Sequence, residues 1–168
     1  MNELQNTELL IVLAEVSAAF IGFSLVIGLL QQSDSRANLR KQAMHSVAEL
    51  AMISGGGSLV VLILAIFDFP TEVVWRSASA IAALLWAVTF HGATIRYATP
   101  ETKWYQVEKA RHAGWLSTIG IILLTFNSVI STGMSEQLHI LGLFLALCTS
   151  GFLFLFSTFL LDSDIKEP

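Results

Sequence analysis

Charged residues are scarce in this sequence of 168 residues. Lys, Arg, Asp and Glu together make up 13% of the chain, against roughly 25% in soluble domains, while hydrophobic residues make up 54%. So few charges cannot solvate the surface of a globule, and the composition therefore excludes an ordinary soluble domain, a disordered chain and a coiled coil. A single cysteine, Cys148, excludes a disulfide framework and the ligand spacing of a zinc finger. The net charge of -4 does not indicate a nucleic-acid partner.

Long apolar runs take the place of the missing charges. A hydrocarbon core of about 30 Å requires around 20 helical residues, and five stretches of the chain meet this requirement. They cover residues 9–30, 44–67, 73–97, 113–131 and 138–161. A helix satisfies its own backbone hydrogen bonds in lipid. We therefore predict an all-α membrane protein with five transmembrane helices in a single transmembrane domain over residues 1–168.

The basic residues predict how the helices are oriented in the membrane. The first and third loops, with their flanks, carry most of the Lys and Arg residues, whereas the second and fourth loops carry none. The residues concerned are Arg36, Arg40, Lys41, Arg96, Lys103, Lys109 and Arg111. Because Lys and Arg accumulate in cytoplasmic loops, this asymmetry predicts an outside N-terminus and an inside C-terminus, in a bacterial inner membrane.

The connector before the fourth span, residues 98–112, is predicted to form a short interfacial helix. Thr99 can cap this helix, and Pro100 suits its first position. The basic side chains expected to reach anionic lipid phosphates are Lys103, Lys109 and Arg111. The alternative interpretation is a surface that binds a cytoplasmic partner.

Four polar residues near the outer ends of their spans are predicted to form an outer polar cluster. They are Glu15, Arg76, Asn127 and His139. A charge at mid-membrane costs about 2.5 to 3.5 kcal/mol, so Glu15 and Arg76 are expected to contact each other. Their contact is interpreted either as a buried ion pair that sets the helix register or as an ion or proton gate at the outer mouth.

A second polar layer is predicted near the cytoplasmic ends of spans two and three. Glu49 and His91 lie at matched depth, and His45 stacks on Glu49 from four residues before it. Three interpretations remain open, namely an interhelical hydrogen-bond cluster, a proton or ion relay, and a metal or haem site. The metal interpretation lacks an HExxH or repeated ExxH pattern.

Three consecutive glycines, Gly55, Gly56 and Gly57, lie at the midpoint of span two. Each costs about 1 kcal/mol relative to alanine in a helix, so the run requires compensation. It is expected either to allow close helix packing or to form a broken segment whose carbonyl groups line a water-filled path. Trp86 of span three is expected to pack over these glycines as a filler or as a hydrophobic gate.

Polar and small residues share one stripe on several spans, at about 100° per residue. On span one the stripe is Glu15, Ala18, Ala19 and Gly22, on span two it is His45, Glu49, Ile53 and Gly56, and on span three it is Arg76, Ser79, Ala83, Ala87, His91 and Thr94. All three stripes are predicted to face the inside of the bundle.

No motif in the sequence identifies a family, and neither a catalytic residue, a metal site nor a cofactor is predicted. The first functional hypothesis is a small homo-oligomeric membrane protein that forms an ion or proton pathway. The residues predicted to line this pathway are Glu49, His91, His45, Gly55, Gly56, Gly57 and Trp86. The second hypothesis is a non-catalytic scaffold, subunit or effector partner, and the third is a membrane metal or haem protein. An enzyme is the less favoured class.

Overall fold

The computed structural model describes residues 6–30, 37–67, 69–96 and 108–156, and over these residues the protein is all-helical. The helices are α1 (Thr7–Leu30), α2 (Ala37–Ala65), α3 (Thr71–Arg96), α4 (Glu108–Val129) and α5 (Ser135–Leu155). Each contains a stretch that is long and apolar enough to cross a membrane. The prediction of an all-α protein with five helices of membrane-spanning length is therefore confirmed.

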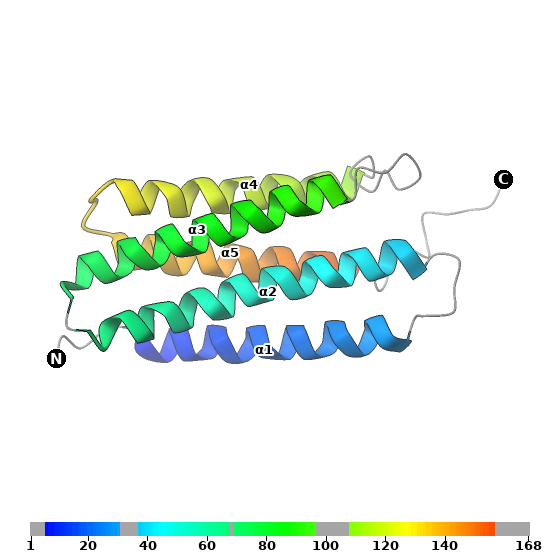
Figure 1. Ribbon diagram of the computed structural model, residues 1–168, viewed down its shortest axis with the longest axis horizontal. Coiled ribbons are helices and arrows are strands. Elements are labelled where there is room, and N and C mark those ends of the chain that lie inside the picture. Colours follow the sequence, from blue (N-terminus) through cyan, green and yellow to red (C-terminus); the bar gives the residue numbers. More distant parts are fainter. Residues whose placement is uncertain (1–5, 31–36, 68, 97–107, 157–168) are drawn as a thin grey trace.

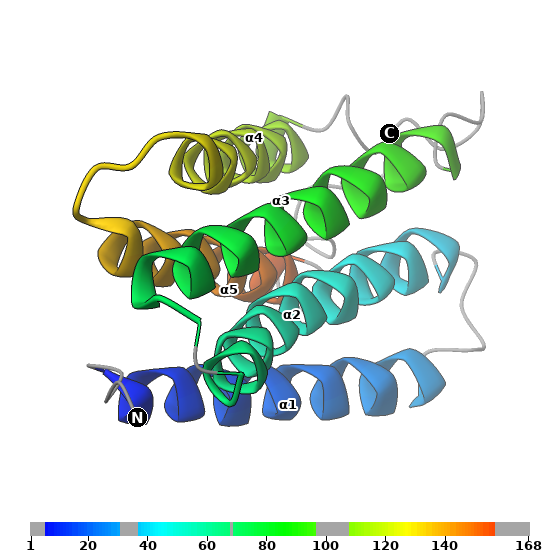
Figure 2. The same ribbon diagram turned by 60° about the vertical axis from the view of Figure 1, so that its left-hand side comes forward.

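The helices lie side by side and alternate in direction along the chain (Figure 1). Helix α1 lies at one edge of the bundle and α4 at the opposite edge, with α2, α3 and α5 between them (Figure 2). The starts of α1, α3 and α5 share one end of the bundle with the last turns of α2 and α4. We call this the N-terminal end, and the other the opposite end.

All five helices begin before the predicted spans, α2 and α4 by the most. Helix α2 begins at Ala37 and α4 at Glu108, rather than at residues 44 and 113. The spans were delimited by apolar residues, but Lys, Arg, Gln and Glu are also good helix formers, so the helices continue beyond the apolar stretch. Residues 97–107, and with them most of the predicted interfacial helix, lie outside the described residues.

Helix α3 is rotated by about a quarter of a turn from its predicted orientation. Its buried side runs through Trp75, Ser79 and Trp86. Of the stripe that was predicted to face inward, Arg76 is only half-buried and His91 is exposed. Ser79 and Ala83 of that stripe are buried, and the inward side of α3 presents two indole rings to the core among small residues such as Ala82.

The expectation that Trp86 packs over the glycines of α2 is wrong. Trp86 packs on Gly120 of α4, where an added Cβ atom would lie 2.2 Å from the indole ring. In the same way, Gly142 of α5 makes room for Leu124 of α4, which would lie 2.5 Å from an added Cβ atom. Real Cβ atoms do not approach other atoms this closely. The absence of a side chain at these two glycines therefore allows large side chains to pack in the core at the usual density of protein interiors.

Helix α2 continues through Gly55, Gly56 and Gly57 without a break. Gly55 lies against α1, and an added Cβ atom there would be 3.0 Å from the Cβ atom of Ser17. Gly57 lies against α5, where the same atom would be 2.5 Å from Leu143, whereas Gly56 faces open space. The run therefore allows close packing on two sides of α2, and the alternative of a broken segment is wrong.

The connection between α4 and α5 depends on a glycine. Gly133 has a φ of 69°, in the left-handed region that glycine adopts without steric conflict. The Met134 N–H donates to Thr132 Oγ1 over 3.2 Å and holds this turn. The turn reverses the chain and places Ser135 beside Asn127, where both contribute to a buried polar site.

Candidate functional site

A buried hydrogen-bonded cluster lies in the N-terminal half of the bundle. We call it the Ser–Asn–His cluster, after Ser79 of α3, Asn127 of α4 and His139 of α5. Asn127 Nδ2 donates to Ser79 Oγ over 2.7 Å and to the Ser135 backbone carbonyl over 2.8 Å. Ser79 Oγ lies 2.8 Å from His139 Nδ1. All three side chains are fully buried, so the cluster joins three helices within the core.

The hydrogen bonds of Asn127 have a defined direction. A carbonyl oxygen can only accept, so the Asn127 atom that faces the Ser135 carbonyl is the amide nitrogen. This nitrogen also donates to Ser79 Oγ, which leaves the Ser79 hydroxyl hydrogen able to donate to His139 Nδ1. In that arrangement a neutral His139 carries its proton on Nε2. The chain ends at Asn127, because an amide nitrogen does not accept a hydrogen bond.

Unused hydrogen-bonding capacity surrounds this cluster. Four buried polar atoms have no hydrogen-bond partner among the described residues: Trp75 Nε1, Asn127 Oδ1, Ser135 Oγ and His139 Nε2. Trp75 packs on His139 with the ring centroids 5.5 Å apart, and the backbone of Gly57 lies beside the same imidazole. Unpartnered buried polar atoms are uncommon in proteins. Here they gather around an ionisable side chain.

Arg76 binds the last turn of α4. Its Nε donates to the Ser128 carbonyl over 3.2 Å, and its Nη2 donates to the Val129 carbonyl over 2.9 Å. A guanidinium in this place satisfies carbonyl groups that the helix leaves free and interacts favourably with the negative end of the helix dipole. Nη1 lies 4.0 Å from Glu72, which also accepts a hydrogen bond from Ser131.

The predicted contact between Glu15 and Arg76 is wrong. Arg76 has its partners on α3 and α4, whereas Glu15 is exposed on the side of α1 that faces away from the bundle. Of the predicted outer polar cluster, the structure brings Asn127 and His139 together through Ser79. Arg76 lies at the rim of the bundle, and Glu15 belongs to a different surface.

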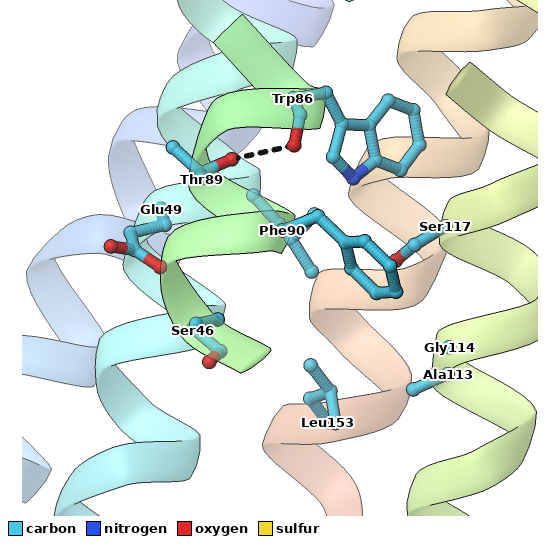
Figure 3. Close-up of a pocket in the computed structure, with 11 residues that line it drawn as sticks. Ser46, Glu49, Trp86, Thr89, Phe90, Ala113, Gly114, Ser117 and Leu153 are labelled. Atoms are coloured by element: carbon cyan, nitrogen blue, oxygen red, sulfur yellow. Dashed lines mark hydrogen bonds between the residues drawn. The ribbon is translucent and has the colours of Figure 1, made fainter. Parts of the chain in front are cut away.

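A cleft opens toward the opposite end of the bundle, between α2, α3, α4 and α5 (Figure 3). The space within it that water could occupy is about 40 Å³, and the cleft is open to the surroundings. Its lining includes Glu49, Ser117 and Trp86. The indole nitrogen of Trp86 lies on the side of the ring that faces Phe90 and Ser117 (Figure 3). Trp86 is fully buried, and its Nε1 has no partner in the described part of the chain.

The three predicted ionisable residues of the cytoplasmic layer occupy different positions. His45 Nε2 lies 3.2 Å from Glu49 Oε1, which confirms the predicted stacking of these two residues. Glu49 is 19% exposed and lines the cleft, whereas neither His45 nor His91 belongs to the lining. Among the described residues, no group of three or more His, Cys, Asp or Glu side chains could hold a metal ion.

An apolar layer lies between the cleft and the Ser–Asn–His cluster. Each of the three helices that form the cluster contributes one residue to this layer, about one turn from its cluster residue. These residues are Ala82 after Ser79 on α3, Leu124 before Asn127 on α4, and Leu143 after His139 on α5. All three apolar side chains are at most 1% exposed. Ser79 and Trp86 are about 10 Å apart along α3, and this layer fills the distance between them.

The sequence analysis did not identify the residues that link the predicted site residues to one another. Ser79 was assigned only to a stripe, and neither Trp75 nor Ser117 was considered. The signal was present in the spacing of Trp75, Ser79 and Trp86, which share one side of a helix. In comparisons with known proteins, no family, curated protein or solved structure matches the chain.

Proposed function

We propose that this chain is an integral membrane protein that passes protons or small cations through the interior of its own helix bundle. The five helices are compatible with a small integral membrane protein. The observation that carries the proposal is the cleft, which has Glu49 among its lining residues and the unpartnered N–H of Trp86 on its buried side. Ionisable residues within membrane spans mark ion and proton routes more often than other polar residues do.

The proposed route leads from the cleft past Trp86 and the apolar layer to His139. Trp86 and Leu143 act as a hydrophobic gate, because an apolar constriction excludes water until it widens. His139 is the next ionisable group, and its Nδ1 accepts from Ser79. An incoming proton binds His139 Nδ1, the nitrogen with a free lone pair, as the Ser79 hydroxyl turns away from it, and the proton on Nε2, beside Gly57, then leaves. His45 contacts Glu49 and supports its position, whereas His91 has no part in this route.

The substitution Glu49→Gln tests the role of the cleft. We expect it to reduce flux about tenfold, which corresponds to about 1.4 kcal/mol on the transfer barrier, because it removes the charge but keeps the side-chain shape. Flux is measured in liposomes with an enclosed pH-sensitive or cation-sensitive dye under an imposed membrane potential. The matched control is Glu8→Gln, which neutralises an exposed carboxylate at the other end of the bundle. Equal flux in wild-type protein and Glu49→Gln would exclude the cleft from the route.

A second candidate is a non-catalytic scaffold or subunit, in which all buried polar groups are structural. The Ser–Asn–His cluster favours this candidate, since it joins three helices and its hydrogen bonds end at Asn127. A scaffold would leave liposomes as tight as liposomes without protein. The flux measurement therefore distinguishes the two candidates.

The proposed orientation has the N-terminus outside and the C-terminus inside, in a bacterial inner membrane. It is supported by the basic residues of the first and third loops, which connect helix ends at the opposite end of the bundle. In this orientation the cleft faces the cytoplasm, where Lys103, Lys109 and Arg111 would contact anionic lipid. A reporter fused after Pro168 is expected to be active in the cytoplasm. Activity of that fusion on the other side of the membrane would reverse the orientation.

A further inference from the structure

The cleft does not bring oxygen atoms together around a common point. The carboxylate of Glu49 and the hydroxyl of Ser117 lie on opposite sides of it, with the Phe90 ring between them (Figure 3). The Thr89 hydroxyl donates to carbonyl groups of its own helix. A Na⁺ or K⁺ ion in a selective pore is held by oxygen atoms that converge on it and replace its hydration shell. The lining of the cleft therefore does not suit a dehydrated metal cation.

The size of the cleft does not suit a hydrated cation either. The space that water could occupy is about 40 Å³, which is room for about three water molecules. Trp86 closes the buried side of this space and is itself fully buried. An alkali cation with a complete shell of water needs more room than this. A small number of water molecules is nevertheless enough to bring a proton to the indole ring.

The apolar layer beyond Trp86 provides no replacement for the water of a metal cation. Ala82, Leu124 and Leu143 are at most 1% exposed, and their side chains contain no polar atom. The helices α2, α3, α4 and α5 run through this layer without interruption, so their carbonyl groups accept hydrogen bonds from the following turn. In transporters, the carbonyl groups that bind ions come from interrupted helices. A metal cation would have to cross this layer without ligands.

A proton can pass where a metal cation cannot, because it moves by exchange between groups that accept and donate hydrogen bonds. His139 lies on the far side of the layer, and it is the single ionisable side chain that is buried in the described part of the bundle. Its Nδ1 lies 2.8 Å from Ser79 Oγ, and its Nε2 makes no hydrogen bond to the described helices. An imidazole in such a place can bind a proton at one nitrogen and release another from the second.

We propose that the bundle passes protons and excludes Na⁺ and K⁺, because the apolar layer admits only an ion that His139 can carry. This inference rests on the proposed function and names its ion. A proton that arrives through water binds Nδ1 and forms an imidazolium. The proton on Nε2 then leaves, so that the ring is neutral again with its hydrogen on Nδ1. The return of the ring to its first tautomer completes the cycle.

The wild-type protein tests the choice of ion without any substitution. Liposomes loaded with K⁺ and an enclosed pH-sensitive dye are diluted into a medium whose cation is too large to permeate. With valinomycin present, K⁺ leaves through the ionophore, and acidification inside reports protons that enter through the protein. With a protonophore instead, protons have their own route, and acidification reports K⁺ that leaves through the protein. Liposomes loaded with Na⁺ are treated with the protonophore in the same way.

We expect acidification with valinomycin, and the rate of protein-free liposomes with the protonophore for both K⁺ and Na⁺. Faster acidification than this with the protonophore would show that a metal cation passes. That result would overturn the inference and leave the proposed function intact. Protein-free rates in all arms would instead overturn the proposed function, and the inference with it.

The substitution His139→Gln tests whether the imidazole carries the proton. Glutamine is polar and can bond to Ser79, but it does not take up a proton, so proton flux should fall at least about a hundredfold. The matched control is His91→Gln, which makes the same change on α3 at an exposed position outside the cleft lining and should leave proton flux unchanged. Helix content and size in detergent show that the variants are folded. Wild-type proton flux in a folded His139→Gln protein would overturn the inference, and the ion selectivity of the wild-type protein tests it independently of this variant.

Discussion

Replacing Asn127 with alanine is expected to lower the free energy of unfolding by about 3 kcal/mol. The substitution removes two buried hydrogen bonds and leaves the Ser135 carbonyl without its side-chain donor. It also opens a cavity at a position that is fully buried. Hydrogen bonds between membrane helices are worth about 0.6 to 2 kcal/mol each, so the two bonds and the cavity contribute similar amounts. Thermal or denaturant unfolding in detergent measures the change.

The matched control for Asn127 is Ser128→Ala, at the next position of the same helix. The Ser128 hydroxyl donates to the Thr125 carbonyl at an exposed position, so its removal is expected to change the free energy by no more than about 0.5 kcal/mol. Equal effects of the two substitutions would show that the Ser–Asn–His cluster does not stabilise the bundle.

Replacing Leu143 with serine is expected to raise flux at least about tenfold, the effect of about 1.4 kcal/mol on the barrier. Leu143 is fully buried in the apolar layer, one turn beyond His139, and it packs on Gly57. Serine is smaller and carries a hydroxyl, so the layer would admit water between the cleft and the imidazole. The assay is the same liposome flux measurement under an imposed potential.

The control for the gate is Leu141→Ser, on the same helix. Leu141 is 47% exposed and lies outside the core, so this substitution should leave flux at the wild-type rate. The increase in Leu143→Ser should also disappear when Glu49→Gln is added, because both residues act on one route. An increase that survives Glu49→Gln would place the conducting path elsewhere.

The number of helices and the minimum length of each could be predicted from the sequence, because a lipid bilayer requires both. Each apolar run had to be helical and about 20 residues long, and the five runs correspond to the five helices. Depth along each helix was also predictable from the rise per residue. Asn127 and His139 were assigned to one layer in this way, and the structure joins them through Ser79.

The orientation of each helix around its axis was harder to predict. A stripe of small and polar residues on α1 has the same pattern whether it faces its own bundle or another chain, and Glu15 faces away from its own bundle. On α3 the prediction assumed that bulky side chains face lipid. The core instead accommodates Trp86, because Gly120 on α4 makes room for it. Such complementarity between distant residues has no signature in a single sequence.

The central claim is that one bundle carries the conducting path, and flux per chain tests it most directly. Wild-type protein and Glu15→Gln are reconstituted at equal density, and the rate of dye response per chain is compared with that of protein-free liposomes. The account predicts flux above the protein-free rate, and the same flux per chain in Glu15→Gln, because Glu15 lies outside the bundle and away from the cleft. Wild-type flux no faster than that of protein-free liposomes would contradict the account.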